Sequence, residues 1–352
     1  MLLASFLGFL LLFLLIGFSS VLVRSKEQSD YLLAGSSVPP SLIGLSAVAT
    51  NNSGFMFIGV IGYTYATGLP AFTMMVGWIL GDWMAATLVT RKVREVSEER
   101  GTLTIPELLS RWGGGHFQVL KVVAALIAVS LLGVYAAAQF KAGGKALQAL
   151  FDWDLRTGAI IGAVMVLCYG FSGGLRASVW TDAAQSVVMI VAMTVMLTMA
   201  VFTVGGWQAA WTGLHDVSPT FFQFFPAESV ASGLTGAALF LIGWTFAGAA
   251  VIGQPHVMVR FMAVNDVKNI RRARTYYYLW FVAFYTLAVG VGMMARLLMD
   301  QGAVDPSLVM SGGQLDAELA LPVMADVLLH PVATGLVLAG LFAATISTVD
   351  SL

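Results

Sequence analysis

Two apolar stretches of the sequence carry polar side chains suited to cation chemistry. The first, residues 46–55, reads Ser-Ala-Val-Ala-Thr-Asn-Asn-Ser-Gly-Phe. Ser, Asn and Gly compete with regular helical hydrogen bonding. An unwound turn in lipid is tolerated only where it is buried in protein or lines a cavity, and its carbonyl oxygens could then coordinate a cation. A packing face of small residues is the alternative. The two adjacent asparagines favour a site, because amides need partners in hydrocarbon.

The second stretch, residues 343–351, reads Ala-Ala-Thr-Ile-Ser-Thr-Val-Asp-Ser. Its four hydroxyls cover much of a helix circumference, and hydroxyl and carbonyl oxygens suit a small hard cation. The alternative is that each hydroxyl bonds back to the preceding turn, which for any single serine is the favoured interpretation. Asp350 differs, because ionisable residues in membrane segments are functional hypotheses by default. The topology derived below places it toward the cytoplasmic end, where water could reach it.

Two further segments, 173–185 and 253–262, join loops to helices. Thr181 or Asp182 could cap the helix that follows the first, and on the residues alone a cap is the favoured interpretation. Pro255 removes a donor and makes the chain turn. His256 alone is more typical of a loop residue than of a proton carrier. The four histidines do not pair with Cys or acidic residues at metal-ligand spacing, which argues against a metal enzyme.

Composition places these segments in a membrane protein. Hydrophobic residues make up 58% of the 352 residues and charged residues 11%, whereas soluble domains carry roughly 25% charged residues. The mean hydropathy is +0.85. The chain lacks the charges to cover a soluble surface, so lipid must cover most of it. The apolar stretch from Met1 to Val23 has no basic start and is too long for a signal peptide, which favours a first membrane helix.

The hydropathy pattern predicts nine spanning helices, because a span needs roughly 20 mostly apolar residues. They lie near 1–22, 40–62, 68–90, 119–140, 157–175, 183–205, 236–254, 276–298 and 331–352. The last begins after Pro331 and ends at Leu352 with no polar flank or basic anchor. We interpret the sequence as cut off before its natural C-terminus.

Basic residues alternate between the connections. The odd-numbered connections hold Arg24, Lys26, Arg91, Lys92, Arg94, Arg100, Arg111, Arg176, Arg260, Lys268, Arg271, Arg272 and Arg274, with Lys121 close behind the third. The even-numbered ones hold only Lys141, Lys145 and Arg156, plus Arg296 near a helix end. Because Lys and Arg mark cytoplasmic loops, the pattern predicts an N-terminus outside and odd-numbered connections in the cytoplasm.

Four short sequence motifs resemble those of the sodium:solute symporter family, and the match spans nearly the whole chain. They are Asp-Tyr-Leu-Leu-Ala-Gly at 30–35, Gly-Gly-Leu-x-Ala…Thr-Asp-x-x-Gln at 173–185, Gly-Gln-Pro-His…Arg-Phe-Met at 253–262, and Ser-Thr-Val-Asp-Ser at 347–351. Each is weak alone, but the order is specific. The third motif, at 253–262, resembles the sodium/proline symporter branch in particular.

The resemblance implies an all-α membrane protein with a LeuT-type core of the APC superfamily. Such a protein has thirteen helices, of which about nine would be present in a single transporter domain, 1–352. An extra helix at 1–22 would precede a first five-helix repeat at 40–205. An incomplete second repeat of inverted topology would occupy 236–352.

The resemblance also implies a set of binding residues. The family's sodium ligands map onto Ala49, Asn52, Ala344, Ser347 and Thr348, through backbone carbonyls and the two hydroxyls. Asp182 matches an aspartate linked to sodium handling, and so becomes a candidate for a secondary sodium pathway. The candidates for the solute pocket are Asn51, Ser53, Gly54, Trp244, Ala247 and Val251.

Several positions depart from the family pattern. Ser36 stands where members usually carry Arg, and Asn51 where proline carriers have Asp. Ala247 and Val251 stand where proline carriers have Trp and Tyr, and the nearby Trp244 is out of phase. The solute pocket therefore need not be a proline pocket.

Together these patterns predict a sodium-coupled symporter of a small organic solute, with an amino acid such as proline as the first candidate and Na⁺ as the coupling ion. Its partners would be the solute and the lipid of a plasma or inner membrane, with no nucleic acid. The alternative is a transporter-like sensory domain of a membrane histidine kinase, with a C-terminal signalling domain. An enzyme is disfavoured, because no acidic, His or Cys cluster has catalytic spacing.

Overall fold

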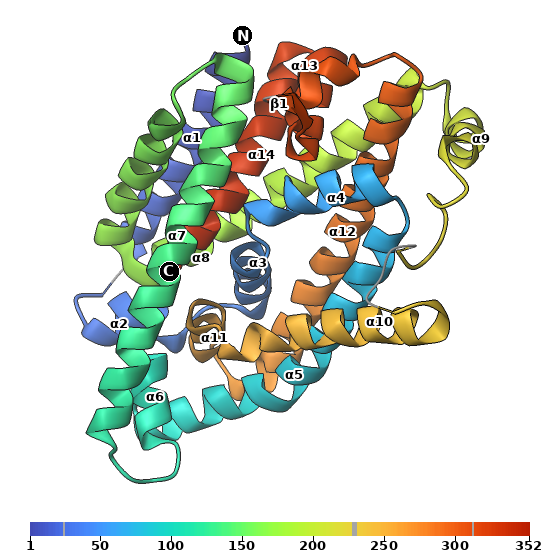
Figure 1. The fold of residues 1–352 in the computed structure, drawn as a ribbon. Helices are drawn as coiled ribbons and strands as arrows, with labels where there is room; N and C mark the ends of the chain where they lie inside the picture. The colour runs from blue at the N-terminus through green and yellow to red at the C-terminus, as the bar shows by residue number, and fades with distance from the viewer. Residues whose placement is uncertain (24, 227–230, 312) are drawn as a thin grey trace.

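The computed structural model describes residues 1–23, 25–226, 231–311 and 313–352. Arg24, one of the basic residues of the first connection, lies outside them. Within the described residues the regular secondary structure is helical, apart from one pair of two-residue strands, β1 (Met310–Ser311) and β2 (Gln314–Leu315), and a single bridge between Val38 and Val264. Figure 1 shows long helices crossing one another around the break between α3 and α4. The α-helices are α1 (Leu2–Ser19), α2 (Gln28–Leu33), α3 (Pro40–Asn51), α4 (Gly59–Thr67), α5 (Pro70–Arg100), α6 (Ile105–Arg111), α7 (Gln118–Phe151), α8 (Leu155–Thr203), α9 (Trp207–Val217), α10 (Gly233–Ala249), α11 (Pro255–Met262), α12 (Ile270–Asp300), α13 (Ala320–Leu328) and α14 (Pro331–Val349).

In the described part of the chain, seven helices are long and apolar enough to cross a membrane, and up to eight if the bent pair α3 and α4 counts as one span. Eight of the nine predicted spans correspond to these. The fifth, 157–175, corresponds to a shorter apolar helix, Arg156–Cys168. The 3₁₀ helices are η1 (Ser20–Val23), η2 (Ala34–Ser36), η3 (Gly54–Met56), η4 (Ala250–Gly253), η5 (Val267–Asn269), η6 (Pro306–Val309) and η7 (Ala317–Leu319).

The second span is broken where the sequence predicted an unwound turn. The segments Pro40–Asn51 and Gly54–Thr67 meet at 68°. Between them Asn52 leaves helical geometry and Ser53 is extended, and the Ser53 hydroxyl accepts a bond from the N–H of Phe55 at 3.3 Å. The serine therefore restarts the helix as an N-cap. The predicted unwound turn is confirmed.

The junction before the sixth predicted span is a kink within α8. Gly174 has φ +58°, which a side chain rarely tolerates, and a Cβ there would lie 2.3 Å from the carbonyl oxygen of Tyr31. The second half of α8 starts at this kink. Asp182 lies roughly two turns further on, so the interpretation of Thr181 or Asp182 as a helix cap is wrong.

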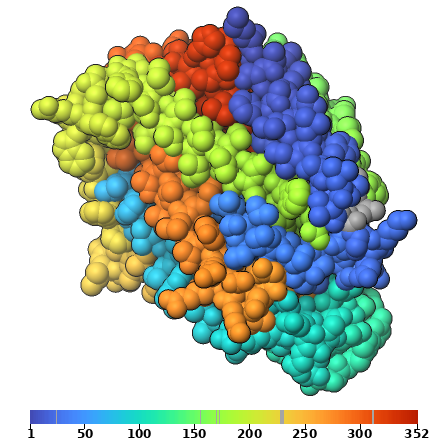
Figure 2. Space-filling model, turned by 180° about the vertical axis from the view of Figure 1, so that it is seen from behind, coloured from blue at the N-terminus to red at the C-terminus, as the bar shows by residue number. Residues whose placement is uncertain are grey.

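Glycines allow the closest approach in the bundle, between α5 and α10. A Cβ on Gly81 would lie 1.8 Å from the carbonyl oxygen of Thr245, and one on Gly248 would lie 1.9 Å from that of Trp78. Small residues at such contacts let membrane helices pack backbone to backbone. On the opposite side, Figure 2 shows α1 (dark blue) lying along α8 (yellow-green) with α14 at its upper end.

The two longest connections carry structure that hydropathy did not predict. The connection after α8 contains α9, and the connection after α12 contains η6, the β1–β2 pair, η7 and α13. α9 and α13 have 11 and 9 residues, too short to cross a membrane. Lys145 of α7 contacts this second connection through ion pairs with Asp316 and Glu318, both at 2.6 Å.

Candidate cation and solute site

The broken end of α3 faces the buried hydroxyls of α14. The Ser347 hydroxyl lies 3.2 Å from the carbonyl oxygen of Ala49 and 3.2 Å from that of Ala344. The Thr348 hydroxyl lies 3.2 Å from the carbonyl oxygen of Thr50 and 3.1 Å from that of Ala344. All five residues are buried. The two stretches singled out in the sequence therefore meet as one cluster of oxygens.

The helix break explains why these carbonyls are available. The last four carbonyl groups of a helix have no partner within it, and α3 ends at Asn51. The C-terminal end of a helix also carries partial negative charge. The hydroxyls of Ser347 and Thr348 can turn their hydrogens away and present lone pairs. This donor set of neutral oxygens fits a small monovalent cation such as Na⁺.

Asn52 is placed differently from the expectation. Among the described residues, the α14 hydroxyls bond the carbonyls of Ala49 and Thr50 and not that of Asn52. The N–H of Asn52 donates to Val48 at 3.0 Å, and its side-chain oxygen accepts from the Tyr285 hydroxyl at 3.2 Å. The nitrogen of its side-chain amide is buried without a partner. The structure thus adds Thr50 to the oxygen cluster and turns the Asn52 side chain toward α12.

A buried ion pair lies beside the oxygen cluster. Asp182 of α8 accepts a bond from Arg260 of α11 at 2.9 Å, and both side chains are 0% exposed. The same carboxylate oxygen accepts from the Ser46 hydroxyl at 2.6 Å and lies 3.4 Å from that of Thr50. Its other oxygen is buried without a partner. Asp182 therefore touches the broken helix at Ser46, one turn before the oxygen cluster, and at the side chain of Thr50, whose carbonyl belongs to the cluster.

The network continues from Asp182 to the end of α14. Arg260 donates to the Ser178 hydroxyl at 2.9 Å and also to that of Ser351. The hydroxyls of Ser351 and Thr50 lie 3.0 Å apart. Ser178 donates to Asp350 at 3.2 Å. A cavity of about 270 Å³ is lined by Ser178, Asp350 and Ser351 together with α2 and α8. Polar groups thus connect the oxygen cluster to this cavity.

A second buried carboxylate, Asp82 of α5, was not singled out from the sequence. It accepts bonds from the hydroxyls of Tyr277 and Tyr278, both at 2.7 Å, and from the Asn51 amide at 3.1 Å. The Asn51 amide also donates to Tyr277 at 2.6 Å. Asp82 interrupts a predicted apolar span, and that alone was a signal for it. The structure therefore places a carboxylate against Asn51, the last helical residue before the break.

Two other solute candidates, Ser53 and Gly54, face α7. Gln139 accepts the N–H of Gly54 at 3.0 Å, and the side chains of Tyr135 and Ser53 lie within hydrogen-bonding reach. The Tyr135 ring lies 5.9 Å from that of His256, whose two nitrogens are buried without a partner. Ser53 and Gly54 of the break thus contact α7, and α7 contacts the start of α11. We call Ser53, Tyr135, Gln139 and His256 the polar centre beside the break.

The remaining candidates lie on α10 and η4, against α5. Trp244 stacks on Trp78 with ring centres 5.6 Å apart, and Phe55 stacks on the same ring at 6.3 Å. Ala247 is half-buried, and Val251, roughly one turn further on, is buried. Among the described residues, these ring contacts connect Trp244 to Phe55 of the break through Trp78. The structure does not bring all six candidates into one cluster.

Comparison with known proteins assigns this architecture to a family. Residues 31–352 match the family model described as "Sodium:solute symporter family". The chain belongs to the sodium:solute symporter family. Two similar relatives are sodium/proline symporters of Staphylococcus aureus, strains bovine RF122 / ET3-1 and JH9. Each is 31% identical over 347 residues, which cover 97% of this chain and 64% of the relative. The chain thus spans less than two thirds of the length of these relatives.

A solved structure has the same fold. It is the substrate-bound, outward-open state of a Na⁺-coupled sialic acid symporter, with a TM-score of 0.85 and 21% identity, and the match covers 99% of this chain and 70% of that one. These relatives are transporters, which confirms that the family is not one of enzymes. Family and apolar helices together make this symporter-family chain a multi-pass membrane protein.

Proposed function

We propose that this symporter-family protein uses sodium to drive the uptake of a small organic solute. The observation that carries the proposal is the oxygen cluster of Ala49, Thr50, Ala344, Ser347 and Thr348, which joins a broken helix to an unbroken one. The Asn52 carbonyl lies at the same break and stays in the proposed ligand set. Na⁺ is a substrate of this reaction, carried along with the solute.

Sodium would act by holding α3 against α14. Carbonyl and hydroxyl oxygens that now bond to one another would instead face the ion, which favours the conformation in which the two helices touch. A ligand shifts a conformational equilibrium only by its differential affinity for the two states. The cluster exists only while α3 and α14 are together, so Na⁺ has that preference.

The solute would bind at the polar centre beside the break. Ser53, Tyr135, Gln139 and His256 offer donors and acceptors there, and the buried amide nitrogen of Asn52 lacks a partner. Unpartnered buried polar groups are costly, so a solute that satisfies them would gain affinity. An amino acid such as proline is the first candidate, because the curated relatives are sodium/proline symporters. Ala247 and Val251 stand where proline carriers have Trp and Tyr, so these two positions do not specify proline as the solute.

Sodium and solute would then leave through the polar network. Asp182, Ser178 and Ser351 lead from the oxygen cluster toward the cavity beside Asp350, which supports Asp182 as a residue of a secondary sodium pathway. We further propose the LeuT-type arrangement, with 40–205 and 236–352 as inverted repeats. In such folds one repeat rocks against the other around a central site.

The test is sodium-driven uptake by the intact protein in proteoliposomes. Replacing Ser347→Ala and Thr348→Ala together should raise the sodium concentration for half-maximal uptake at least about ten-fold, because two ligand oxygens are lost. The matched control is Thr194→Ala with Thr198→Ala on α8. Its hydroxyls are exposed and bond only to their own helix, so its sodium dependence should stay unchanged.

Two results would contradict the proposal. Unchanged sodium dependence in the Ser347→Ala/Thr348→Ala variant would show that these two hydroxyls do not bind sodium. The second assay measures uptake of proline and of a panel of other amino acids, sugars and carboxylates. If a sodium gradient did not change the uptake of any of them, transport would not be coupled to sodium.

A further inference from the structure

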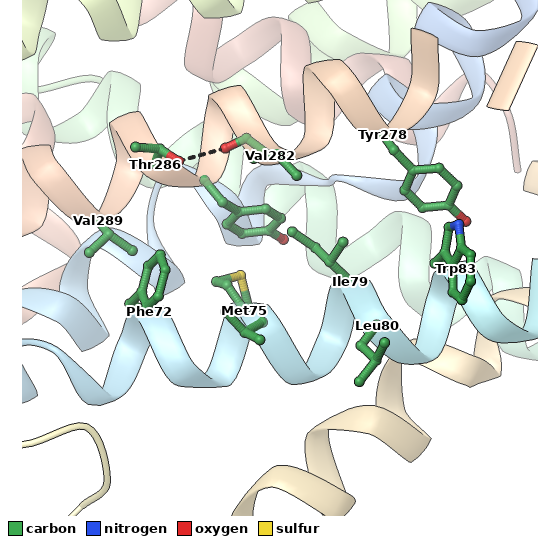
Figure 3. Close-up of a pocket in the computed structure, with 11 residues that line it drawn as sticks. Phe72, Met75, Ile79, Leu80, Trp83, Tyr278, Val282, Thr286 and Val289 are labelled. Carbon is green, nitrogen blue, oxygen red and sulfur yellow. Dashed lines mark hydrogen bonds between the residues drawn. The ribbon is translucent and has the colours of Figure 1, made fainter. Parts of the chain in front are cut away.

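Two cavities lie between α5 and α12, outside the cation and solute site. One has a volume of about 330 Å³ and the other of about 1030 Å³. They share Trp83, Tyr278 and Val282 in their linings, so they form one continuous surface. Figure 3 shows the smaller one, with side chains from the two helices pointing into the space between them. We call the smaller cavity the apolar groove and the larger one the basic cavity.

The apolar groove matches the depth of one lipid leaflet. Along α5 it runs from Phe72 to Trp83, and along α12 from Val289 back to Tyr278. Eleven residues of helix rise roughly 16 Å, which is about half of a hydrocarbon core of roughly 30 Å. Phe72, Leu80 and Trp83 are between 42% and 50% exposed. The groove is therefore open to lipid along its length.

The basic cavity adjoins the end of the groove at Trp83. Its charged lining residues are Arg91, Lys268, Arg271 and Arg274. Arg91 is paired with Glu95 at 2.7 Å. In the described parts of the chain, the other three form no ion pair. The cavity lining therefore carries an excess of positive charge, of which the buried Asp82 carboxylate offsets a part at Arg274.

Arg274 is held in place by hydrogen bonds, by the Tyr278 ring and by attraction to the buried Asp82 carboxylate. Its guanidinium donates to the Trp83 carbonyl at 3.3 Å and to the Thr87 hydroxyl, and it lies 5.7 Å from the centre of the Tyr278 ring. Its Nε is buried without a partner. These contacts fix the side chain at the boundary between groove and cavity. The Arg274 guanidinium thus lies at this boundary with one N–H, that of Nε, still without an acceptor.

We propose that this surface binds an anionic phospholipid, with the headgroup phosphate in the basic cavity and an acyl chain along the apolar groove. Charge complementarity supports an anionic headgroup, because basic pockets between membrane helices on the cytoplasmic side bind such headgroups. The predicted orientation places this end in the cytoplasm. Trp83 lines both the groove and the cavity, so it marks the point where an acyl chain and a headgroup would meet. The proposal does not depend on the transported solute.

Native mass spectrometry of the full chain in detergent tests the proposal. Dioleoyl phosphatidylglycerol and dioleoyl phosphatidylcholine have the same acyl chains and differ in headgroup charge. Phosphatidylglycerol should bind at least about ten-fold more tightly. Replacing Arg271→Gln and Arg274→Gln together should weaken its binding about 25-fold, at roughly five-fold per basic side chain, and leave phosphatidylcholine unchanged.

The matched control removes two charges from the same helices. Lys92→Gln with Arg272→Gln changes exposed basic residues that do not line the cavity. Phosphatidylglycerol binding should change less than about two-fold, because these side chains do not contact the headgroup and salt screens exposed charges most strongly. Val282→Trp, which fills the groove, should weaken the binding of both lipids.

Three results would overturn the proposal. One is equal binding of the two lipids by the unmodified chain, a comparison that requires no variant to fold. Another is an equal loss in the control and the cavity variant. The third is full displacement of phosphatidylglycerol by millimolar inorganic phosphate at constant ionic strength, because the site would then take free phosphate and the groove would have no role.

Discussion

At the scale of single residues, the Asp182–Arg260 pair is the most demanding feature for a protein in lipid. Both side chains are fully buried, and Ser46, Ser178 and Ser351 surround them with hydroxyls. Removing two charges from water is costly, and their attraction compensates only when further hydrogen bonds complete the geometry. The hydroxyls supply those bonds. In this conformation the pair therefore holds α3, α8, α11 and the segment after α14 together.

Replacing Asp182→Asn should destabilise the protein strongly. Asparagine keeps the size of the side chain and removes its charge, which leaves Arg260 buried and uncompensated, at a cost of about 3–5 kcal/mol. Thermal unfolding in detergent should show a much lower midpoint than the parent. Asp216→Asn, which removes an exposed carboxylate on α9, is the control and should unfold with the parent. An unchanged midpoint for Asp182→Asn would show that the pair is not a fixed structural charge pair.

The residue types of the oxygen cluster could be predicted, but their partners could not. Hydroxyl-rich stretches at 46–55 and 343–351 point to cation chemistry, and the resemblance supplies Ala49, Ser347 and Thr348. Nothing in the chain order indicates that Arg260 neutralises Asp182, because 78 residues separate them. Asp82 was recognisable as a charge within an apolar span. Its three partners follow only from how α3, α5 and α12 pack.

At the scale of elements, the break between α3 and α4 depends on a glycine in close contact with α14. A Cβ on Gly54 would lie 2.6 Å from the methyl carbon of Thr345 and 3.3 Å from the Gln139 side-chain oxygen. Both neighbours are buried, so the surrounding structure has little room to move. The position of the oxygen cluster along α14 therefore depends on the absence of a side chain at residue 54.

Replacing Gly54→Ala should push the break away from α14 and weaken sodium binding. The expected result is an increase of about ten-fold or more in the sodium concentration for half-maximal uptake, because small misplacements at a preorganised site are expensive. Thr345→Ser removes the methyl group that clashes, so the double variant should recover much of the affinity. Gly243→Ala is the control, since a Cβ there meets nothing within 4 Å.

The double variant makes this prediction specific. If Gly54→Ala lowered sodium affinity and Thr345→Ser did not restore any of it, the contact between break and α14 would not be the cause. Normal sodium dependence in Gly54→Ala alone would show that the break can shift without affecting the site.

Hydropathy predicts elements well where apolar runs are long and poorly where they are short. The spans at 68–90 and 276–298 correspond to α5 and α12. Each helix is longer than its predicted span, because polar residues at the C-terminal end of α5 and at the N-terminal end of α12 continue the helix. α9 and α13 were missed, since short amphipathic helices in a connection have no spanning signal. The kink at Gly174 was interpreted as a loop, because sequence alone does not show that Tyr31 packs against it.

At the scale of the whole molecule, the basic residues divide the ends of the spans into two groups. Arg91, Lys92 and Arg94 lie at the C-terminal end of α5, and Lys268 and Arg271 lie at the N-terminal end of α12. Both ends lie low in Figure 1, while the C-terminal end of α12 lies high. Since positive residues favour the cytoplasmic side, one face of the bundle should be cytoplasmic. The N-terminus, at the other end in Figure 1, should be outside.

Single cysteines in intact cells test this orientation. The chain has one native cysteine, Cys168, so a Cys168→Ser background gives an unlabelled start. Ala303→Cys, exposed after α12, should react with a membrane-impermeant maleimide in intact cells, because α12 carries the chain from the basic face to the opposite one. Lys92→Cys, exposed at the basic end of α5, should react only after the membrane is permeabilised. The reverse pattern would invert the topology and would place the proposed anionic lipid in the outer leaflet, whereas labelling of both positions in intact cells would show that α12 does not cross the membrane.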